Sequence, residues 1–235
     1  KAISDNDETI TNETETVSMT IDGKDYTVAV GDLAKVTYEG TELTVRIMGF
    51  NHDQLTDTVA YGGENTYAGI SFEFVDYITT AGMNNSIATT SGGWGATELR
   101  TTLNSTTINS LSNSSYIKEV NKSYIGTYNN ANSVTTSSDK LWLLSCSEIW
   151  NNGYNGTGTY GYAIAKEGEQ YKYYKDINAT YNSNNASLVK GSSYWWLRSP
   201  YYNRIGCFCS VIWAGRSNDY LWATNAIGVA PGFAI

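Results

Sequence analysis

The ordered part of this chain begins with short stretches in which apolar and polar residues alternate. Each stretch is interrupted by a pair of residues that ends in glycine. The stretch VSMTIDGKDYTVAV alternates around Asp22-Gly23, and AKVTYEGTELTVRIMGF alternates around Glu39-Gly40. A period of two places every second side chain on one face of a strand, and such pairs favour tight turns between antiparallel strands. Two β-hairpins are therefore predicted within residues 16–50.

Later segments combine strand and helix patterns, so the predicted class is α+β. GISFEFVDYI starts as a strand at Ile70 to Phe74 and could turn helical after Asp76. GGWGATELRTTLN predicts a short helix of roughly 96–103, because its apolar residues recur at helical spacing after the glycines. A second helix is predicted in SSYIKEVNKSY from the stripe formed by Tyr116, Ile117, Val120 and Tyr124.

The segment LWLLSCSEIW, residues 141–150, predicts a buried strand that passes through Ser145 into a turn of helix with Glu148 near its start. A tract rich in glycine, asparagine and tyrosine follows at 151–187. Its tyrosines favour a long loop that is ordered by packing on a scaffold. Residues 1–15 are polar and acidic without periodicity, which predicts a linker or frayed terminus before a single domain at 16–235.

The charge balance narrows the classes of partner. With a net charge of −8 and a pI near 4.6, the chain does not suit nonspecific binding to nucleic acid or to an anionic membrane. No apolar run is long enough to span a bilayer. The chain instead combines 19 tyrosines and 7 tryptophans with many asparagines, serines and glycines, a composition typical of binding surfaces.

Cysteine and histidine usage predicts neither a metal site nor a cofactor. Cys146, Cys207 and Cys209 cannot all pair within one chain, and the spacing of the last two is too short for a zinc knuckle. His52 is the only histidine. Buried free thiols are expected.

Several phrases together resemble a known family: IMGFNHD, GGWGATELRTTLN, DKLWLLSCSEIW, EGEQYKYY and, most specifically, WWLRSP followed by GVAPGF. They resemble modules of gut Firmicutes and their phages whose C-terminal half is similar to the C-type-lectin-like fold of formylglycine-generating enzymes. The resemblance covers roughly residues 30–235. It implies a C-type-lectin-like fold with twisted antiparallel sheets, a few short helices, long ordered loops and the N-terminal hairpins.

In part of that family the end of the chain is the variable region of a diversity-generating retroelement, which copies a template with errors at adenines. Asparagine-type AAC codons altered in this way never encode Lys, Glu, Gln, Met or Trp. Lys, Glu, Gln and Met together number 27 in residues 1–200, a frequency that would place between four and five of them in the last 35 residues. Residues 201–235 contain none, as a diversified region predicts, although a buried terminal sheet would also be poor in these types.

The resemblance divides the variable region, 201–227, into scaffold residues, which form a frame, and ligand-binding residues, which form a face. The recurring Phe-Cys-x-Val and Gly of the family match Phe208, Cys209, Val211 and Gly215, which are expected to be scaffold. Trp213 and Trp222 cannot arise from AAC codons, so each is expected either in the core or as an exposed anchor. The predicted ligand-binding residues are Tyr201, Tyr202, Asn203, Arg204, Ile205, Cys207, Ser210, Ile212, Arg216, Asn218, Asp219, Tyr220, Leu221, Trp222, Thr224, Asn225 and Ile227.

A face that tolerates many sequences cannot supply the folding energy, so the core is expected outside it. The expected core residues are Trp142, Leu143, Leu144, Trp195, Trp196, Leu197, Val229 and Phe233. Arg198 lies among apolar neighbours, where an unpaired guanidinium is costly. A structural ion pair is expected with Glu148 or Asp139.

Two rival functions compete with a binding role. The fold relatives include oxidases that act through a cysteine pair and copper, but here Cys207 would be a position expected to vary, and no complete catalytic set is present in the sequence. Calcium-dependent sugar binding would require a proline-containing triplet and a Trp-Asn-Asp triplet. Neither occurs, since the only prolines are Pro200 and Pro231 and Asn218-Asp219 follows Ser217.

The resulting hypothesis is a noncatalytic display domain on a bacterial cell surface or a phage particle. Its C-terminal face would bind a protein or glycan ligand that differs between sequence variants, with no nucleic acid partner and no membrane insertion. The alternative is a surface adhesin or carbohydrate-binding module of fixed specificity, in which Tyr201, Tyr202, Tyr220 and Trp222 could stack on a sugar.

If the face carries no folding energy, replacing Tyr202, Arg204 and Tyr220 together by serine leaves the thermal stability nearly unchanged. The melting temperature, followed by circular dichroism, is expected to fall by less than about 8 °C for a domain of this size. A larger fall would contradict the surface placement.

Overall fold

The computed structural model describes residues 10–21, 23–61, 66–128, 130, 133–150, 166–181, 183–202 and 204–235, with only the backbone at 20, 21 and 218–220. Within these residues β-strands dominate and the helices are short, which confirms the α+β class. The strands form four sheets, and the described pairs are antiparallel apart from β12 with β9.

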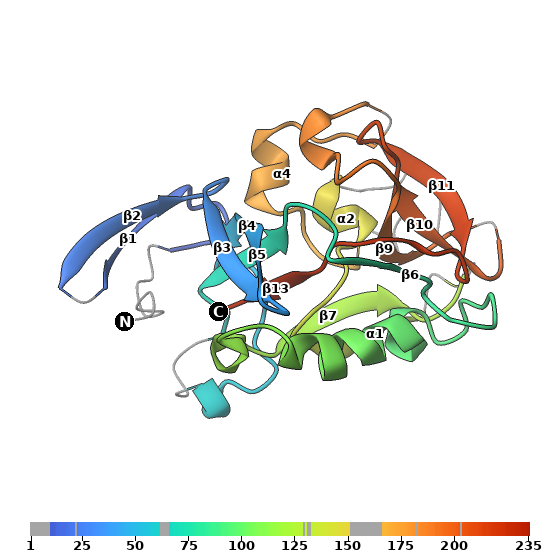
Figure 1. Ribbon diagram of the computed structural model, residues 1–235, viewed down its shortest axis with the longest axis horizontal. Coiled ribbons are helices and arrows are strands. Elements are labelled where there is room, and N and C mark those ends of the chain that lie inside the picture. Colours follow the sequence, from blue (N-terminus) through green and yellow to red (C-terminus); the bar gives the residue numbers. More distant parts are fainter. Residues whose placement is uncertain are drawn as a thin grey trace.

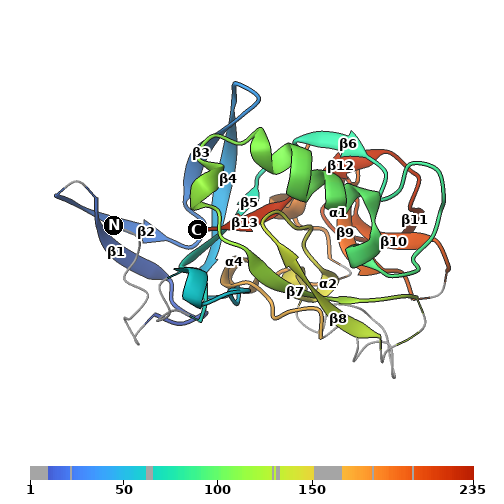
Figure 2. The same ribbon diagram turned by 90° about the horizontal axis from the view of Figure 1, so that it is seen from below.

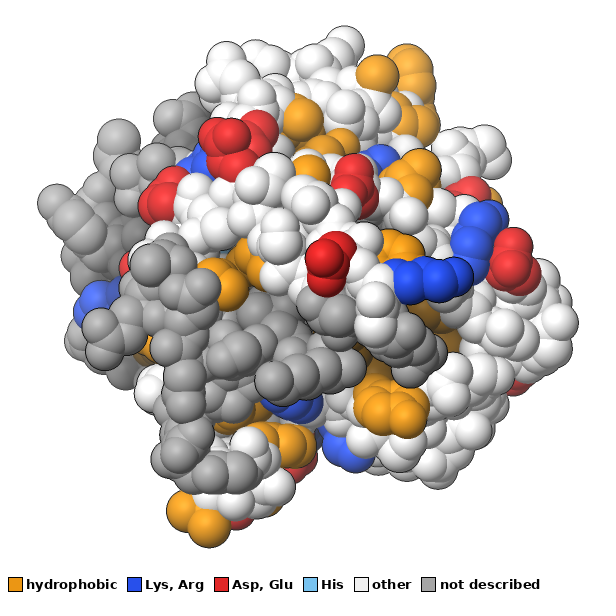
Figure 3. Space-filling view, turned by 90° about the vertical axis from the view of Figure 1, so that its left-hand side faces the viewer, with side chains coloured by type: hydrophobic (Ala, Val, Ile, Leu, Met, Phe, Trp, Pro, Cys, Tyr) orange, Lys and Arg blue, Asp and Glu red, His pale blue; other side chains and the backbone are white. Residues whose placement is uncertain are grey.

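Both predicted N-terminal hairpins are present. Their strands are β1 (Thr16–Ile21), β2 (Lys24–Ala29), β3 (Leu33–Tyr38) and β4 (Thr41–Phe50). The second turn has positive φ angles of 48° at Glu39 and 77° at Gly40, as a tight hairpin turn requires. Figure 1 shows β1 and β2 projecting from one end of the molecule. On that end, hydrophobic side chains of the described residues form small groups among polar ones (Figure 3).

The strands β3 and β4 continue into a four-stranded sheet of order β13-β5-β4-β3. Its other members are β5 (Ile70–Phe74), which confirms the predicted strand, and β13 (Gly232–Ala234). The helix that the sequence left open after Asp76 is not formed. The chain there enters β6 (Thr79–Ala81), because the backbone amide of Ile78 and the strand itself pair with β12.

A five-stranded sheet of order β11-β10-β9-β12-β6 forms the other half of the molecule. Its remaining strands are β9 (Trp195–Pro200), β10 (Cys207–Val211), β11 (Ser217–Trp222) and β12 (Ile227–Val229). Alternate side chains of the sheet enter two different cores, Trp196 and Phe208 on one face and Leu197 and Val211 on the other. Every residue of β9 and β10 is buried, so this sheet is covered on both faces.

One of the two predicted helices is confirmed. The α-helix α1 (Glu98–Thr102) begins after Thr97, whose side chain accepts a hydrogen bond from the amide of Arg100. A 3-10 turn (Trp94–Ala96) precedes it and a π-helical turn (Leu103–Thr107) follows.

The second predicted helix is wrong. A 3-10 turn (Ser114–Tyr116) leads into β7 (Val120–Ile125), which pairs with β8 (Val134–Asp139). Residues four apart share a face in a strand as well as in a helix, so the spacing of Tyr116, Val120 and Tyr124 fits both. Tyr116 is 71% exposed, whereas Val120 and Tyr124 are buried. In Figure 2, β7, β8 and α1 lie in front of the larger sheets.

The segment 141–150 is buried as expected, but its first part is no full strand. Trp142 forms a single bridge with Gly232, and the helical turn α2 (Cys146–Ile149) then begins after Ser145. Of the tract 151–187, residues 151–165 and 182 lie outside the described residues. The rest contains α4 (Lys172–Asp176) and a 3-10 turn (Ala186–Leu188); a further 3-10 turn lies at Val59–Tyr61.

Residues 10–15, predicted as part of a linker or frayed terminus, are bound to the body of the molecule. Asn12 donates a hydrogen bond to Glu169, Glu13 pairs with Lys175, and the carboxylate of Glu15 lies 3.2 Å from the ammonium of Lys172. Residues 1–9 lie outside the described residues. None of the described helices has the length and apolarity needed to cross a membrane.

The doubly covered sheet predicts opposite outcomes for two aromatic residues of the C-terminal region. Phe208→Ala empties a fully buried position and is expected to lower the free energy of unfolding by about 3–5 kcal/mol. Trp213→Ala removes an exposed ring and is expected to change it by no more than about 0.5 kcal/mol. Urea denaturation of both variants measures the difference, and similar losses in the two would contradict the assignment of frame and surface.

Candidate functional site

The hairpin of β10 and β11 lies at the end of the molecule opposite β1 and β2 (Figure 1). Glycines hold the turns on both sides of β10 against the body. Gly206 has a φ of 80°, and a Cβ there would lie 2.4 Å from the carbonyl oxygen of Ala88. Gly215 has a φ of 72°, and a Cβ there would lie 1.8 Å from the carbonyl oxygen of Asn185. No other residue type fits either turn, so the outline of the hairpin is fixed.

The structure brings part of the predicted ligand-binding set to the surface. Leu221 is half-buried, and Asn203 and the side chains of Asn218, Asp219 and Tyr220 lie outside the described residues. The exposed members are Tyr202, Arg204, Ile205, Arg216, Trp222, Thr224 and Asn225.

Five residues of the predicted set are buried and do not belong to an exposed face. Cys207 and Ser210 lie on β10, which pairs with a strand on each side and faces a core on both surfaces. Tyr201 packs into the core beside Cys207, and Ile212 and Ile227 are also buried. Contact with a ligand would require these side chains to leave the core, so their inclusion in the face is corrected.

Trp213 and Trp222, each expected either in the core or as an exposed anchor, are both exposed. Trp213, in the turn between β10 and β11, is 62% exposed, and Trp222, at the end of β11, is 44% exposed. The two rings lie at opposite ends of the hairpin, because Trp222 pairs with Cys207 and the turn follows Val211.

A loop far away in sequence extends the face, and the sequence analysis missed it. The amide of Asn84 donates to the carbonyl of Ala223, next to Trp222, and Ala88 lies against Gly206, next to Ile205. Ile87, on this loop, is 68% exposed. No local pattern marks this residue, since only the fold brings residues 84–90 to the hairpin.

A network of buried charges begins at Arg198 on β9 of the five-stranded sheet. The Arg198 guanidinium binds the Glu148 carboxylate through two parallel contacts of 2.5 and 2.9 Å, so of the two predicted partners Glu148 is the one present. Asp139 instead pairs with Arg100 at 2.6 Å. Ser145 and Glu148 form a reciprocal capping box at the start of α2, which holds the carboxylate in place. Despite burial, Arg198 and then Lys122 keep the pKa of Glu148 below its usual value.

Lys122 extends this network to residues that the sequence analysis did not select. Its ammonium lies 2.5 Å from Glu148 and 2.6 Å from Asp53, and it donates to the Tyr171 hydroxyl at 3.2 Å. Asp53 also accepts from Ser71 and Tyr171. Burial opposes ionisation of Asp53, but Lys122 outweighs it and the pKa of this carboxyl is held far below its usual value. The sequence did contain a signal for this residue. Lys122 lies at the every-second-residue spacing of Val120 and Tyr124, so it shares the buried face of β7 with them.

Glu167 is the one buried carboxyl of this network whose pKa is raised. Burial raises it from 4.5 to about 7, although Arg198 and a hydrogen bond from Ser199 act in the opposite direction. The backbone amide of Ile125 also donates to Glu167, at 2.9 Å. The side chain is therefore protonated in part near neutral pH while it remains hydrogen-bonded.

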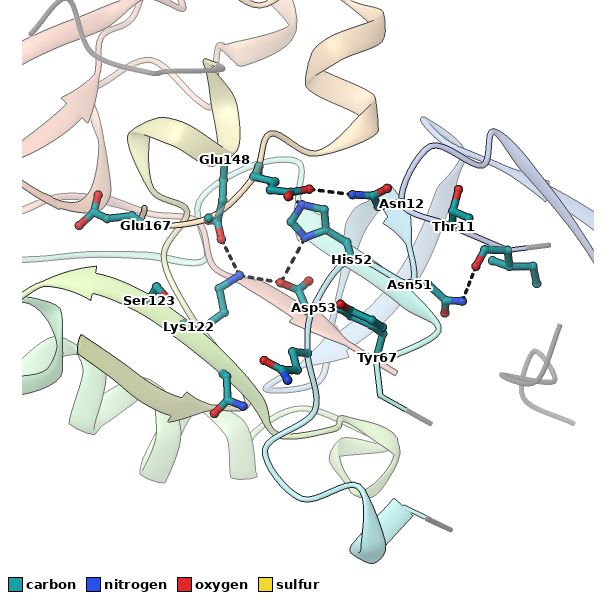
Figure 4. Close-up of a pocket in the computed structure, with 15 residues that line it drawn as sticks. Thr11, Asn12, Asn51, His52, Asp53, Tyr67, Lys122, Ser123, Glu148 and Glu167 are labelled. Atoms are coloured by element: carbon teal, nitrogen blue, oxygen red, sulfur yellow. Dashed lines mark hydrogen bonds and ion pairs between the residues drawn. The ribbon is translucent and has the colours of Figure 1, made fainter. Parts of the chain in front are cut away.

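Beside this network lies a polar cavity of about 450 Å³ (Figure 4). His52 stacks on Tyr171, with ring centroids 3.8 Å apart, and its ring nitrogens face the carboxylate of Asp53 and the carbonyl of Glu169. The deep charged groups bind one another, so their first role is to hold the surrounding segments together.

Across the part of the chain that the structure describes, histidines, cysteines and carboxylates form no cluster that could hold a metal ion. Cys146, Cys207 and Cys209 are buried thiols, as expected. Burial raises the pKa of the Cys207 thiol, which disfavours the reactive thiolate.

The raised pKa of Glu167 predicts a specific pH dependence of stability. The folded state retains a proton that the unfolded chain releases between pH 4.5 and about 7, so the free energy of unfolding falls as pH rises through this window. The fall amounts to about 3 kcal/mol and levels off above pH 7. Glu167→Gln abolishes this contribution.

Urea midpoints of the wild type and of Glu167→Gln, measured at pH 5 and pH 7.5, test this dependence. The difference in stability between the two proteins is expected to shift in favour of the variant at the higher pH, since titrations common to both cancel. A difference that does not change with pH would contradict it.

Comparison with known proteins shows the family to which the chain belongs. No curated protein and no solved structure matches the chain. A family model described as a domain of unknown function, DUF6273, matches residues 74–235. The match runs from the end of β5 to β13 and includes Trp213 and Trp222. This match covers more than half of the chain, which therefore belongs to the DUF6273 family.

Proposed function

We propose that the chain is a noncatalytic ligand-binding display domain with a C-type-lectin-like fold, carried on a bacterial cell surface or a phage particle. Its C-terminal face binds a protein or glycan ligand, and a diversity-generating retroelement varies that face. The antiparallel sheets, short helices and central WWLRSP strand are compatible with the proposed fold.

One observation carries the proposal: large exposed side chains stand on a hairpin whose frame is fully buried. Trp213, Trp222 and Ile205 are exposed, whereas Phe208 and Val211 between them are completely buried. A ligand can bind such a surface without disturbing the core, and exposed aromatic residues are the usual anchors of protein interfaces.

The burial of each side chain limits the positions that we propose to vary. Substitutions at Tyr202, Arg204, Ile205, Arg216, Thr224 and Asn225 would change only the surface, whereas substitutions at Cys207 or Ser210 would alter a close-packed core. We therefore assign diversification to the exposed members of the predicted set other than Trp222. Trp213 and Trp222 supply constant contact area, and their variable neighbours supply specificity.

A fixed-specificity carbohydrate-binding module is the second candidate. The ring of Tyr202 lies 4.9 Å from that of Tyr201 in an edge-on arrangement, so it is held in place as a platform would be. Trp222 is exposed and pairs across the sheet with Cys207, whose carbonyl accepts a hydrogen bond from the backbone amide of Tyr201. A glycan array with and without a chelator tests this role. Selective glycan binding by the unvaried chain would favour it over the diversified face.

Sequencing this locus across its source population tests the diversification. Substitutions are expected at codons 202, 204, 205, 216, 224 and 225, at template adenines, while 208, 209, 211 and 215 stay constant. If residues 201–227 are as constant as WWLRSP, the retroelement origin is wrong and a dedicated ligand becomes the better account.

A further inference from the structure

The polar cavity lies apart from the C-terminal face and has no role in the proposed function. Its walls come from segments distant in sequence: the loop 51–54, strand β7, the segment 167–169 and the bound N-terminal residues 10–12. Figure 4 shows His52, Asp53, Lys122 and Glu148 in contact along one wall, with Asn12, Asn51 and Tyr67 beside it.

Three asparagines of the wall have the same hydrogen-bonding pattern. Asn12 donates its amide nitrogen to Glu169 at 2.8 Å, Asn51 to the carbonyl of Ile10 at 2.9 Å, and Asn121 to the carbonyl of Leu55 at 3.3 Å. Because each nitrogen faces an acceptor, the orientation of each amide is fixed. Each Oδ1 remains without a hydrogen-bond partner among the described residues, and that of Asn51 is also buried.

Asn51 has a second unusual property. Its φ is 44°, in the left-handed region that non-glycine residues adopt only at a cost. The surrounding structure holds a strained residue with an unsatisfied acceptor at the edge of the cavity. Such combinations persist where a ligand or neighbour compensates for them.

The charges around the cavity leave an excess of carboxylate. Asp53 and Glu148 are neutralised by Lys122 and Arg198, which bind them at 2.5–2.6 Å. Lys122 has all its donors engaged, by Asp53, Glu148 and the Tyr171 hydroxyl, so it offers none to a ligand. Glu169, which is exposed, receives only the amide of Asn12, and it has no basic partner among the described residues.

We propose that this cavity binds a small organic cation bearing N–H donors, a protonated primary amine or a guanidinium, through the amide oxygens of Asn12 and Asn121 and the carboxylate of Glu169. These three groups are acceptors, which a donor-only cation satisfies and which a polyol would match only in part. The ring of Tyr67, exposed at the rim, adds a surface over which a cation can lie.

Isothermal titration calorimetry of the whole chain with agmatine, at low ionic strength, tests the site. Tetramethylammonium carries the same sign of charge without N–H donors, and sorbitol carries hydroxyl donors without charge. Agmatine is expected to bind at least about tenfold more tightly than either, since hydrogen bonds to a charged group contribute about 1.5–3 kcal/mol. Equal binding of tetramethylammonium or preferential binding of sorbitol would overturn the proposed ligand class.

Matched variants locate the binding. Glu169→Gln and Asn121→Ala are each expected to weaken agmatine binding by about threefold to tenfold, because the first removes the charge of an acceptor in the cavity and the second removes an acceptor. Glu42→Gln removes the same charge from an exposed position on β4, where the partner is Lys35, and is expected to leave binding unchanged.

Thermal melting confirms that each variant is folded before its affinity is compared. If the two cavity variants bind agmatine as the wild type does, or if Glu42→Gln weakens binding equally, the site is not this cavity. The C-terminal face contains none of these residues, so failure of this proposal leaves the proposed function untouched.

Discussion

The bidentate contact between Arg198 and Glu148 is the interaction on which the two halves of this molecule depend. Arg198 lies at the centre of β9, in the middle of the doubly covered sheet, and Glu148 lies on α2. Through Lys122 the same carboxylate reaches β7, and through Asp53 it reaches the loop that follows β4. Both groups are completely buried, so either one alone would be a costly unpaired charge. The pair is therefore as much a constraint on the packing as a source of stability.

A second buried carboxylate repeats this arrangement in the four-stranded sheet. Glu73 on β5 binds Arg46 at 3.0 Å and Lys190 at 2.6 Å, and it accepts from the hydroxyl of Tyr174 on α4. The two networks join elements that are far apart in sequence, and none of the described charged side chains of the β10–β11 hairpin is buried. The surface of that hairpin can accordingly be apolar and aromatic without interrupting an ionic contact.

Features that depend on a few neighbouring residues could be predicted from the sequence, whereas features that depend on contacts between distant segments could not. Hairpins and the cap at Ser145 depend on a few adjacent residues, and the pairing of Arg198 followed from the cost of burying a charge among apolar neighbours. The strand β7 was mistaken for a helix because spacings of four satisfy both periods. The burial of Cys207 and Ser210 could not be predicted, since it depends on which strands flank β10. The buried network joins Asp53 to Tyr171, 118 residues away, and Ile87 reaches the face only through the fold.

The turns at Gly206 and Gly215 and the exposed Trp213 and Trp222 have a consequence at the level of the genetic code. Tryptophan has the single codon TGG, and the glycine codons other than GGA also lack adenine. A copying process that errs only at adenines passes over such codons, so it would retain both the anchors and the fixed turns while it altered their neighbours. Successive variants of the face would then keep one backbone outline and differ in charge, size and polarity alone. Their targets would share a common shape while differing in chemistry.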